Sequence, residues 1–188
     1  MSGERPPGGP EFGGLLESAR RLLDAVAAAE APDEVVLAAT RQIEAACAAL
    51  EPYGVEEEQA PAGNRPDLPG RGSPLLVPLV LDHERPDEVR GRVTFHRAHL
   101  GGGKAAHGGV QPLLFDELLG RLASIGRPRS RTAYLRVDYR KVTPLGVELR
   151  VEGRIRRTEG RKIFAYGQLL HGEQILAEAE ALFVQLRP

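Results

Sequence analysis

The sequence predicts an α+β fold in which a curved antiparallel sheet wraps around one long central helix, with a helical hairpin before it. The first observation is the apolar run that ends near Ile125, where Leu114, Leu118 and Leu122 recur at helical spacing. The second is that apolar and charged residues alternate in the segments after this run, as in half-exposed strands. The third is that only short turns separate these segments, and short turns join antiparallel strands.

The N-terminal part of the chain is predicted to form an extension. Residues 1–14 are rich in glycine and proline with little to bury, which predicts a flexible N-terminus. Residues 15–53 carry two amphipathic helical patterns, and Pro32 marks the start of the second. Such a hairpin is not stable alone, so we expect it to pack on the main domain or across a dimer interface. Residues 54–73 are predicted to be a linker, and residues 74–188 the main domain.

The main domain is expected to begin with a β-hairpin. Residues 75–81 are short and apolar, and residues 88–96 alternate, with a turn-like segment at residues 83–87 between them. The central helix follows, and Gly126-Arg127-Pro128 stops it. Four further strands complete the sheet. The turns that separate them are predicted at residues 144–146, 159–160 and 171–173.

Composition narrows the class of partner. The 188-residue chain (20.4 kDa) is 41% hydrophobic with a formal net charge of −1, so its bulk charge does not indicate a nucleic acid or an anionic membrane. No apolar run approaches the roughly 18 residues of a membrane span, and the N-terminus shows no apolar leader segment. The single cysteine, Cys47, cannot form an intrachain disulfide, and its alanine-rich helical pattern predicts a buried or half-buried thiol. We therefore expect a cytoplasmic protein without a nucleic-acid or membrane partner.

A glycine-dense loop opens directly into the central helix and ends in His107-Gly108-Gly109. Backbone N–H groups point out of a helix N-terminus, which suits a developing negative charge. The helix also contains Asp116, whose i−4 and i+4 neighbours are Pro112 and Gly120, so its own helix face offers no basic partner. We expect this carboxylate to be poorly solvated and to have a function. The structural alternatives are that it caps a loop or pairs with an arginine of a partner chain.

These segments, in this order, resemble the hotdog-fold acyl-CoA thioesterases, in particular the phenylacetate-pathway and THEM-type branch of the 4-hydroxybenzoyl-CoA thioesterase superfamily. The resemblance rests on the His-Gly-Gly motif before a helix with an acidic residue, and it covers residues 74–186. It extends through the segments at residues 131–140, 143–146, 160–164 and 177–184. It implies a hotdog fold and a homodimer, or a dimer of dimers, in which a second copy covers one open sheet edge.

The resemblance also implies roles for residues. Asp116 matches the catalytic carboxylate, acting as nucleophile or as base for water, and the Gly108 N–H matches the group that binds the thioester oxygen. Thr132 matches the hydroxyl that holds the lytic water, although a threonine in a strand needs no such role. His107 is expected to orient the loop rather than transfer a proton. Many relatives carry Asn or Gln where this chain has Gly101.

The remaining candidates concern substrate binding. A basic cluster around the turn at residues 159–160 could receive the phosphates of coenzyme A, or it could be a solvated hairpin end. Gly109 would allow close approach of the substrate, or would simply complete the turn. Glu117 has Arg121 one turn on, which predicts an ordinary surface pair. The substrate-binding candidates are Gly109, Glu117, Arg154, Arg156, Arg161 and Lys162, and Arg157 belongs to the same basic cluster.

The predicted function is hydrolysis of an acyl-CoA to a free acid and coenzyme A, without a metal or an organic cofactor. His96 and His99 lack a third ligand at usable spacing, and no phosphate-binding or dinucleotide motif is present. The alternative from another class is a non-catalytic acyl-CoA-binding or regulatory protein. A hotdog dehydratase is less favoured, because that chemistry pairs a catalytic histidine with its acid on a differently spaced segment.

Overall fold

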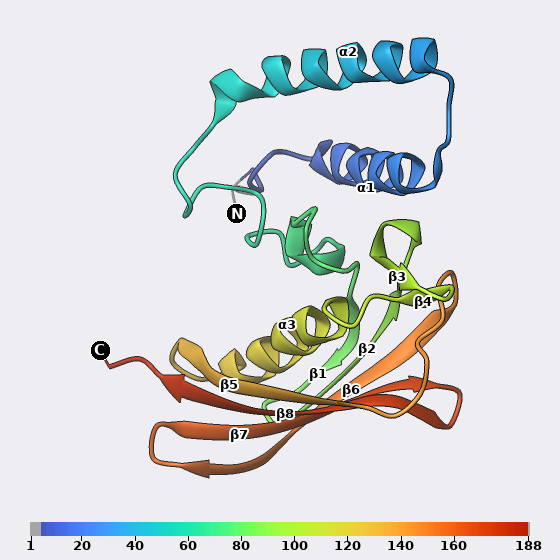
Figure 1. Ribbon diagram of the computed structural model, residues 1–188. Helices are drawn as coiled ribbons and strands as arrows, with labels where there is room; N and C mark the ends of the chain where they lie inside the picture. Colours follow the sequence, from blue (N-terminus) through green and yellow to red (C-terminus); the bar gives the residue numbers. More distant parts are fainter. Residues whose placement is uncertain (1–4, 188) are drawn as a thin grey trace. The chain divides into compact units, whose positions relative to one another are not determined.

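The computed structural model describes residues 5–187 (Figure 1). The chain divides into two compact units, residues 1–73 and 74–188. Among residues 5–187, no helix has the length and the hydropathy that crossing a membrane requires. The first unit contains helices α1 (Phe12–Ala28) and α2 (Asp33–Leu50) and two short 3-10 helices, Glu51–Tyr53 and Pro69–Gly72.

Helix α1 begins at Phe12, so residues 12–14, predicted to belong to a flexible terminus, are helical; residues 1–4 of that prediction lie outside the described residues. The reason lies in the segment predicted as a linker, where the buried Arg65 side chain binds this end of the unit. Its Nη1 donates hydrogen bonds to the carbonyls of Pro7 (3.0 Å) and Gly9 (2.9 Å), and its guanidinium lies 5.9 Å from the centre of the Phe12 ring. Residues 54–73 therefore contain more ordered structure than their composition indicates.

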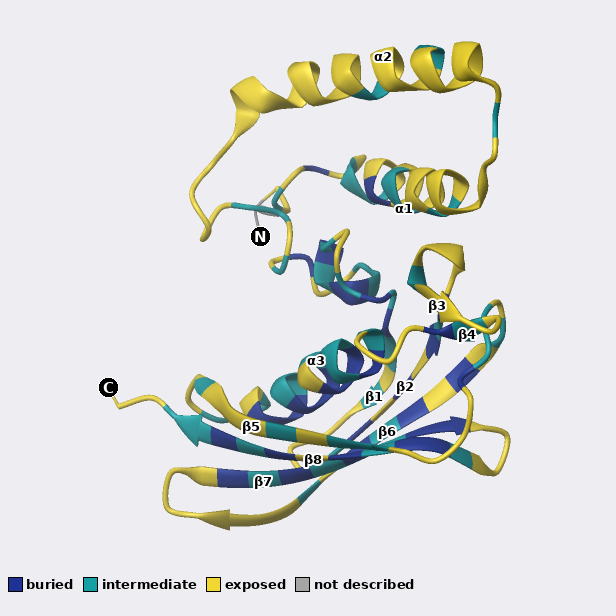
Figure 2. Ribbon diagram, viewed as in Figure 1, coloured by how far each residue is buried: buried dark blue, intermediate teal, exposed yellow. Residues whose placement is uncertain are grey.

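The prediction of a buried or half-buried Cys47 is wrong, because the thiol is exposed. None of the residues of α2 is buried, and Figure 2 shows this helix exposed along nearly its whole length. The apolar pattern of α2 is real, yet Val35, Val36 and Leu50 each keep about half of their surface exposed. An alanine-rich stripe offers little apolar area for burial, so helical spacing alone does not determine that a residue is covered.

The main part of the second unit is a six-stranded antiparallel sheet and helix α3 (Val110–Ser124), as predicted. The strand order is β1-β2-β6-β7-β8-β5, so β1 and β5 form the two edges. Figure 1 shows the sheet curving around α3. The strands are β1 (Val80–Glu84), β2 (Glu88–Thr94), β5 (Ser130–Tyr139), β6 (Glu148–Glu159), β7 (Lys162–His171) and β8 (Gln174–Gln185). Between β2 and α3 lie a 3-10 helix, Arg97–His99, and a small ribbon of β3 (Leu100–Gly102) and β4 (Ala105–Ala106).

The first strand lies further along the chain than predicted. We expected residues 75–81, but β1 runs over Val80–Glu84, and the turn is confined to residues 85–87. Pro74 and Pro78 explain the shift, since proline cannot donate a hydrogen bond to a strand ladder. Val77 and Leu79 are nevertheless buried in the core, which is why the segment looks like a strand in sequence.

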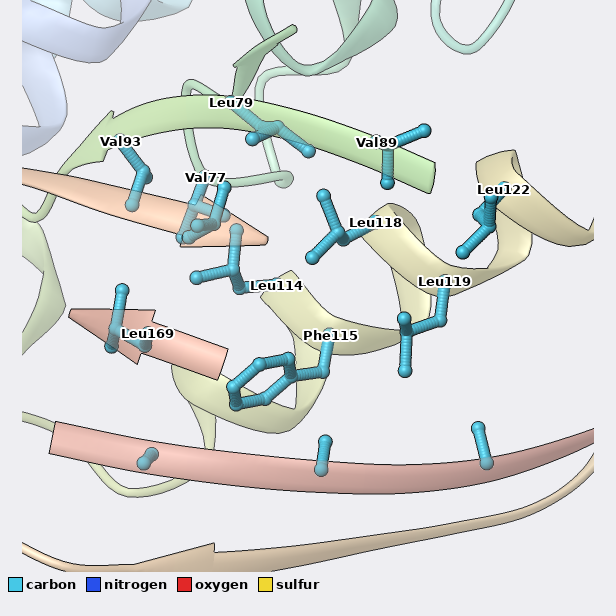
Figure 3. Packing of buried hydrophobic residues seen from close by; sticks show 14 of the residues in the cluster. Val77, Leu79, Val89, Val93, Leu114, Phe115, Leu118, Leu119, Leu122 and Leu169 are labelled. Carbon is cyan, nitrogen blue, oxygen red and sulfur yellow. The ribbon is translucent and has the colours of Figure 1, made fainter. Parts of the chain in front are cut away.

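Helix α3 packs closely on the sheet because two glycines face it. Gly153 of β6 and Gly167 of β7 are cross-strand partners. A Cβ at Gly153 would lie 3.0 Å from both the Leu119 Cδ2 and the Val89 Cγ2 atoms, and a Cβ at Gly167 would lie 3.2 Å from the Phe115 Cδ1 atom. Figure 3 shows Leu114, Phe115, Leu118, Leu119 and Leu122 of α3 among the other buried residues of this core.

The glycine pair gives a stability prediction. Gly153→Val places new methyl groups against Leu119 and Val89, so the free energy of unfolding should fall by about 1–3 kcal/mol, the usual cost of overpacking. This cost exceeds the roughly 1 kcal/mol range of β-propensity, which favours valine. Urea denaturation measures the change. The matched control is Gly102→Val, where no atom lies within 4 Å of the new Cβ, and equal stability of the two variants would contradict the account.

Candidate active site

Asp116 lies on the face of α3 that turns away from the core. Phe115 and Leu119 are fully buried, whereas the Asp116 side chain is exposed. The expectation that Asp116 is poorly solvated is therefore wrong for the single chain. Its cause is geometric: the buried stripe takes up one side of the helix, and position 116 falls on the other side.

Thr132 of β5 reaches this carboxylate. Its Oγ1 donates a hydrogen bond of 2.8 Å to Asp116 Oδ1. Thr132 pairs with the buried Phe183 of β8, and opposed residues share a face of the sheet, so its side chain is directed toward α3. The register shifts between Thr132 and Tyr134, and the extra residue, Ala133, changes the direction of the strand there. Two predicted candidates that are 16 residues apart in sequence are thus in direct contact.

Glu117, the other acid of α3, is half-buried. Arg121, expected to pair with it, reaches the edge strand β1, where its Nε lies 2.6 Å from Glu84 Oε2. Both partners of this ion pair are about one-third exposed, and such pairs contribute little to stability. Arg121 therefore links α3 to β1 across the sheet's edge.

The glycine loop is shaped by His107. A Cβ at Gly101 would lie 2.6 Å from the His107 Cα, so no side chain fits at this position, where the family resemblance implies Asn or Gln in many relatives. The His107 N–H donates to the carbonyl of His99 (2.7 Å), which holds the loop against the preceding 3-10 helix. The absence of a side chain at Gly101 is thus a packing requirement of this loop.

Two neighbouring peptide units of the His-Gly-Gly motif are held by hydrogen bonds. The His107 carbonyl accepts from the Val110 N–H (3.1 Å). In a trans peptide the C=O and the following N–H point in opposite directions, so the Gly108 N–H points away from the first turn of α3. The next unit is held at both ends: the Gly109 N–H donates to His107 Nδ1 (2.9 Å), and the Gly108 carbonyl accepts from the Tyr139 hydroxyl (2.7 Å).

These contacts distinguish the two glycines. The Gly109 N–H is engaged with the imidazole, whereas within residues 5–187 the Gly108 N–H has no hydrogen-bond acceptor. The imidazole must be neutral with its proton on Nε2 for Nδ1 to accept. A Cβ at Gly109 would lie 3.1 Å from that nitrogen, so glycine leaves room for the His107 ring. Gly108 is exposed, and its N–H is therefore available to an external acceptor.

Helix α3 separates the backbone of Gly108 from that of Asp116 within one chain. Helix α3 begins at Val110, six residues before Asp116, and a helix rises about 1.5 Å per residue. The separation along the axis is thus roughly 9 Å, and Gly108 precedes the helix by two further residues. A single chain therefore carries both candidate groups, with more than one turn of helix between their backbones.

The predicted basic cluster is divided in the structure. Arg154 and Arg156 lie over the ring of Tyr166, with guanidinium carbons 5.1 Å and 4.2 Å from its centre. Arg154 pairs with Tyr166 across β6 and β7, and the adjacent Gly153 faces α3, so these arginines lie on the outer face of the sheet. Arg157 lies over Phe164 at 3.7 Å and pairs with Glu159 at 2.7 Å.

The other two basic candidates lie near the Thr132 end of the sheet. Lys162 pairs with Val184 of β8, and Val184 pairs on its other side with Arg131, the neighbour of Thr132. Arg161 Nη1 donates to the carbonyl of Gln185 (2.8 Å), which fixes the side chain beside the C-terminal strand. Among residues 5–187, no group of three or more His, Cys, Asp or Glu side chains is arranged to hold a metal ion.

Tyr139 is the residue of this site that sequence reasoning missed. It is the last residue of β5 and lies 31 residues from Gly108 in the chain. Its only sequence signal is that of a tyrosine in a strand, which is an ordinary preference. The contact depends on how the end of β5 meets the glycine loop, and no local pattern encodes that meeting.

Comparison with known proteins places the chain among thioesterases. No family model matches the sequence. The acyl-coenzyme A thioesterase THEM4 of Xenopus laevis is 36% identical over 84 residues, which are 44% of this chain and 38% of that protein, so the chain spans well under half of that relative. A Pseudomonas aeruginosa protein named as an esterase is 34% identical over 119 residues, which are 60% of this chain and 89% of that protein.

Solved structures extend the likeness to almost the whole chain. The crystal structure of a thioesterase superfamily protein has a TM-score of 0.80 at 27% identity, covering 97% of this chain and 94% of that chain. A Streptococcus mutans protein solved with bound acetyl-CoA has a TM-score of 0.54 at 19% identity, covering 56% of this chain and 86% of that chain. The second likeness concerns the fold alone.

A charged hydrogen-bond network around Glu178 lies outside the candidate site, on the other face of the sheet. Glu178 of β8 accepts hydrogen bonds from the Tyr166 hydroxyl, from Arg140 Nε (2.8 Å) and from Gln168 Nε2 (3.3 Å). The hydrogen bond from Tyr166 and that from Arg140 hold the pKa of the Glu178 carboxyl below its usual value. Burial, followed by the hydrogen bond to Glu178, raises the pKa of Tyr166 to about 12.

This network predicts a pH-dependent contribution to stability. Because the pKa of Glu178 is lowered in the folded chain, its stabilising effect is present above the unfolded value of about 4.3 and is lost as pH falls through the folded pKa. Glu178→Gln should therefore lower the unfolding temperature at pH 7 and have a shrinking effect below about pH 4. Thermal unfolding of both proteins across pH measures this. A difference that grows on acidification would contradict the assignment.

Proposed function

The chain belongs to the hotdog-fold thioesterases, and from this premise we propose that it hydrolyses an acyl-CoA to the free acid and coenzyme A. Asp116 acts as nucleophile or as general base, and the Gly108 N–H polarises the thioester carbonyl. The observation that carries the proposal is the hydrogen bond from Thr132 to Asp116, because it orients an exposed carboxylate on the central helix. The names of the relatives support the thioester chemistry.

The Asp116 carboxylate can work in two ways. As a nucleophile it attacks the carbonyl carbon, the C–S bond breaks with loss of the coenzyme A thiolate, and water hydrolyses the resulting anhydride. As a base it takes a proton from a water that attacks the same carbon. Thr132 suits both, since its hydroxyl proton goes to Asp116 and its oxygen lone pairs remain free to accept from a water.

The oxygen of the thioester needs a donor where negative charge develops. The Gly108 N–H has a direction set by neighbouring hydrogen bonds, and no acceptor within the described residues competes for it. It precedes the N-terminus of the 15-residue helix α3, where the helix dipole favours negative charge. A preorganised donor of this kind stabilises the transition state without reorganisation during the reaction.

The separation of Gly108 and Asp116 leads to a shared site. Because one chain holds them roughly 9 Å or more apart along α3, the Gly108 N–H and the Asp116 carboxylate that act on one thioester come from two chains. The ten-residue edge strand β5 supports this arrangement, since an uncovered edge of that length readily pairs with another strand. We therefore propose a homodimer or a dimer of dimers.

Acyl-CoA is the proposed substrate class. The relative named as an acyl-coenzyme A thioesterase and the solved neighbour with bound acetyl-CoA support it. Lys162 and Arg161 lie toward the end of the sheet where Thr132 contacts Asp116, so they are the basic candidates best placed for the phosphates. Arg154 and Arg156 lie over Tyr166, further along the strands from Thr132, which disfavours them. The face of the sheet does not separate the candidates, since Lys162 precedes the buried Ile163 and so lies on the outer face as well.

Asp116→Asn tests the function. The amide keeps the size of the side chain but removes its charge, so kcat for acyl-CoA hydrolysis should fall by about 10² or more, the scale of a lost nucleophile or base. Stability should not fall, since the side chain is exposed. The assay mixes the protein with a panel of acyl-CoAs and a thiol reagent that reports released coenzyme A.

Asp82→Asn is the matched control, because it makes the same chemical change on an exposed residue of β1, where Asp82 lies 3.3 Å from Arg92 in a surface ion pair. It should leave kcat unchanged. An active Asp116→Asn beside an inactive Glu117→Gln would place the catalytic acid one residue further on. If the wild-type protein binds acyl-CoA without releasing a thiol, the proposed enzymatic activity is wrong and the protein is an acyl-CoA-binding protein.

A further inference from the structure

We propose that Tyr139 is a positioning residue of the thioesterase site. It holds the peptide unit between Gly108 and Gly109, which directly follows the Gly108 N–H. The inference rests on the proposed function, since it assigns a purpose to a contact of the proposed oxyanion donor. Tyr139 does not contact the carbonyl of the substrate in this account. It acts through the backbone of Gly108.

The Tyr139 side chain projects from a fixed piece of backbone. Tyr139 pairs with Ala177 at the end of β5. Directly after it, the N–H groups of Arg140 and Lys141 both donate to the carbonyl of Leu176, at 2.8 Å and 3.0 Å. The strand end that carries the ring is therefore bound to β8 on one side, while the hydroxyl reaches the glycine loop on the other.

The hydroxyl completes a clamp on one peptide unit. The Gly108 carbonyl accepts from Tyr139, and the Gly109 N–H of the same unit donates to His107 Nδ1. A peptide unit is planar, so a hydrogen bond at each end fixes its orientation. A Cβ at Gly108 would lie 3.7 Å from the Tyr139 hydroxyl oxygen, so the phenol group lies on the side of Gly108 toward which a side chain would project.

The clamp matters because both residues that it holds are glycines. Glycine populates many backbone conformations, so a loop of two adjacent glycines does not fix the direction of an N–H by itself. An oxyanion donor lowers the barrier only when it is already aimed at the developing charge. With Tyr139 in place, the rotation of the Gly108–Gly109 unit is restricted on both sides. The unit before it, which carries the Gly108 N–H, is held only at the His107 carbonyl by Val110, so the clamp on its neighbour helps that N–H to keep its direction between turnovers.

Removing the hydroxyl should misalign the donor without deleting it. Loss of a whole oxyanion donor costs about 10²–10³ in kcat, so a loosened donor should cost less, on the order of tenfold. The effect should appear in kcat with KM nearly unchanged, because the alignment matters most in the transition state. The unfolding temperature should hardly change, since Tyr139 is 52% exposed and its aromatic ring is retained in phenylalanine.

The experiment compares Tyr139→Phe with Tyr134→Phe in steady-state acyl-CoA hydrolysis. Tyr134 lies on the same strand with a similar exposure, 47%, and loses the same hydroxyl, so it controls for the chemical change. We expect a roughly tenfold loss of kcat for Tyr139→Phe only. Amide hydrogen exchange should also become faster at Gly109 and Val110 in that variant and remain unchanged in the control. Tyr139→Leu, which removes the hydroxyl and the ring, should show at least the same loss of kcat.

The outcomes separate this inference from the proposed function. Equal kcat values for Tyr139→Phe and Tyr134→Phe, with Asp116→Asn inactive, would overturn the positioning role and leave the thioesterase intact. A higher KM at constant kcat would overturn it as well, because Tyr139 would then bind substrate. A wild-type chain that hydrolyses no acyl-CoA would overturn both.

Discussion

The close packing of α3 on the glycine pair of β6 and β7 is the constraint on which the rest of this domain depends. Gly153 and Gly167 leave room for Leu119 and Phe115, so one whole face of the helix is buried against the sheet. Asp116, one of the polar residues of this helix, is thereby placed on the opposite face. A packing requirement thus determines where the carboxylate lies before any chemistry is considered.

Strand β5 contacts the candidate catalytic groups of α3 and of the loop before it. Near its start Thr132 binds Asp116, and at its end Tyr139 binds Gly108, so one strand contacts both candidate groups of α3 and its preceding loop. The same strand is an edge of the sheet. If a second copy pairs there, as we propose, assembly and the geometry of the site are controlled by the same ten residues.

Sequence patterns predicted the periodic parts of this structure and failed where a contact depends on tertiary arrangement. The helical spacing around Leu118 predicted α3, and the His-Gly-Gly motif before it identified the loop. The prediction that Asp116 is poorly solvated was wrong. Periodicity shows which residues share a face of a helix, but only the assembled sheet shows which face is covered. The prediction for Cys47 was wrong because helical spacing alone does not determine that a residue is covered, and the alanine-rich stripe of α2 offers little apolar area. The Tyr139 contact was missed because it joins two segments without a shared pattern.

A structure with an inert substrate analogue tests the central claim most directly, namely that Asp116 and Gly108 act on one thioester from two chains. In the analogue a methylene group replaces the thioester sulfur of an acyl-CoA, so the carbonyl remains but cannot be cleaved. The account predicts its oxygen about 2.7–3.1 Å from the Gly108 nitrogen of one chain. Its carbon should lie roughly 3–3.5 Å from an Asp116 oxygen of the other chain, or one water away. A carbonyl held by both groups of a single chain, or by neither, would contradict the account.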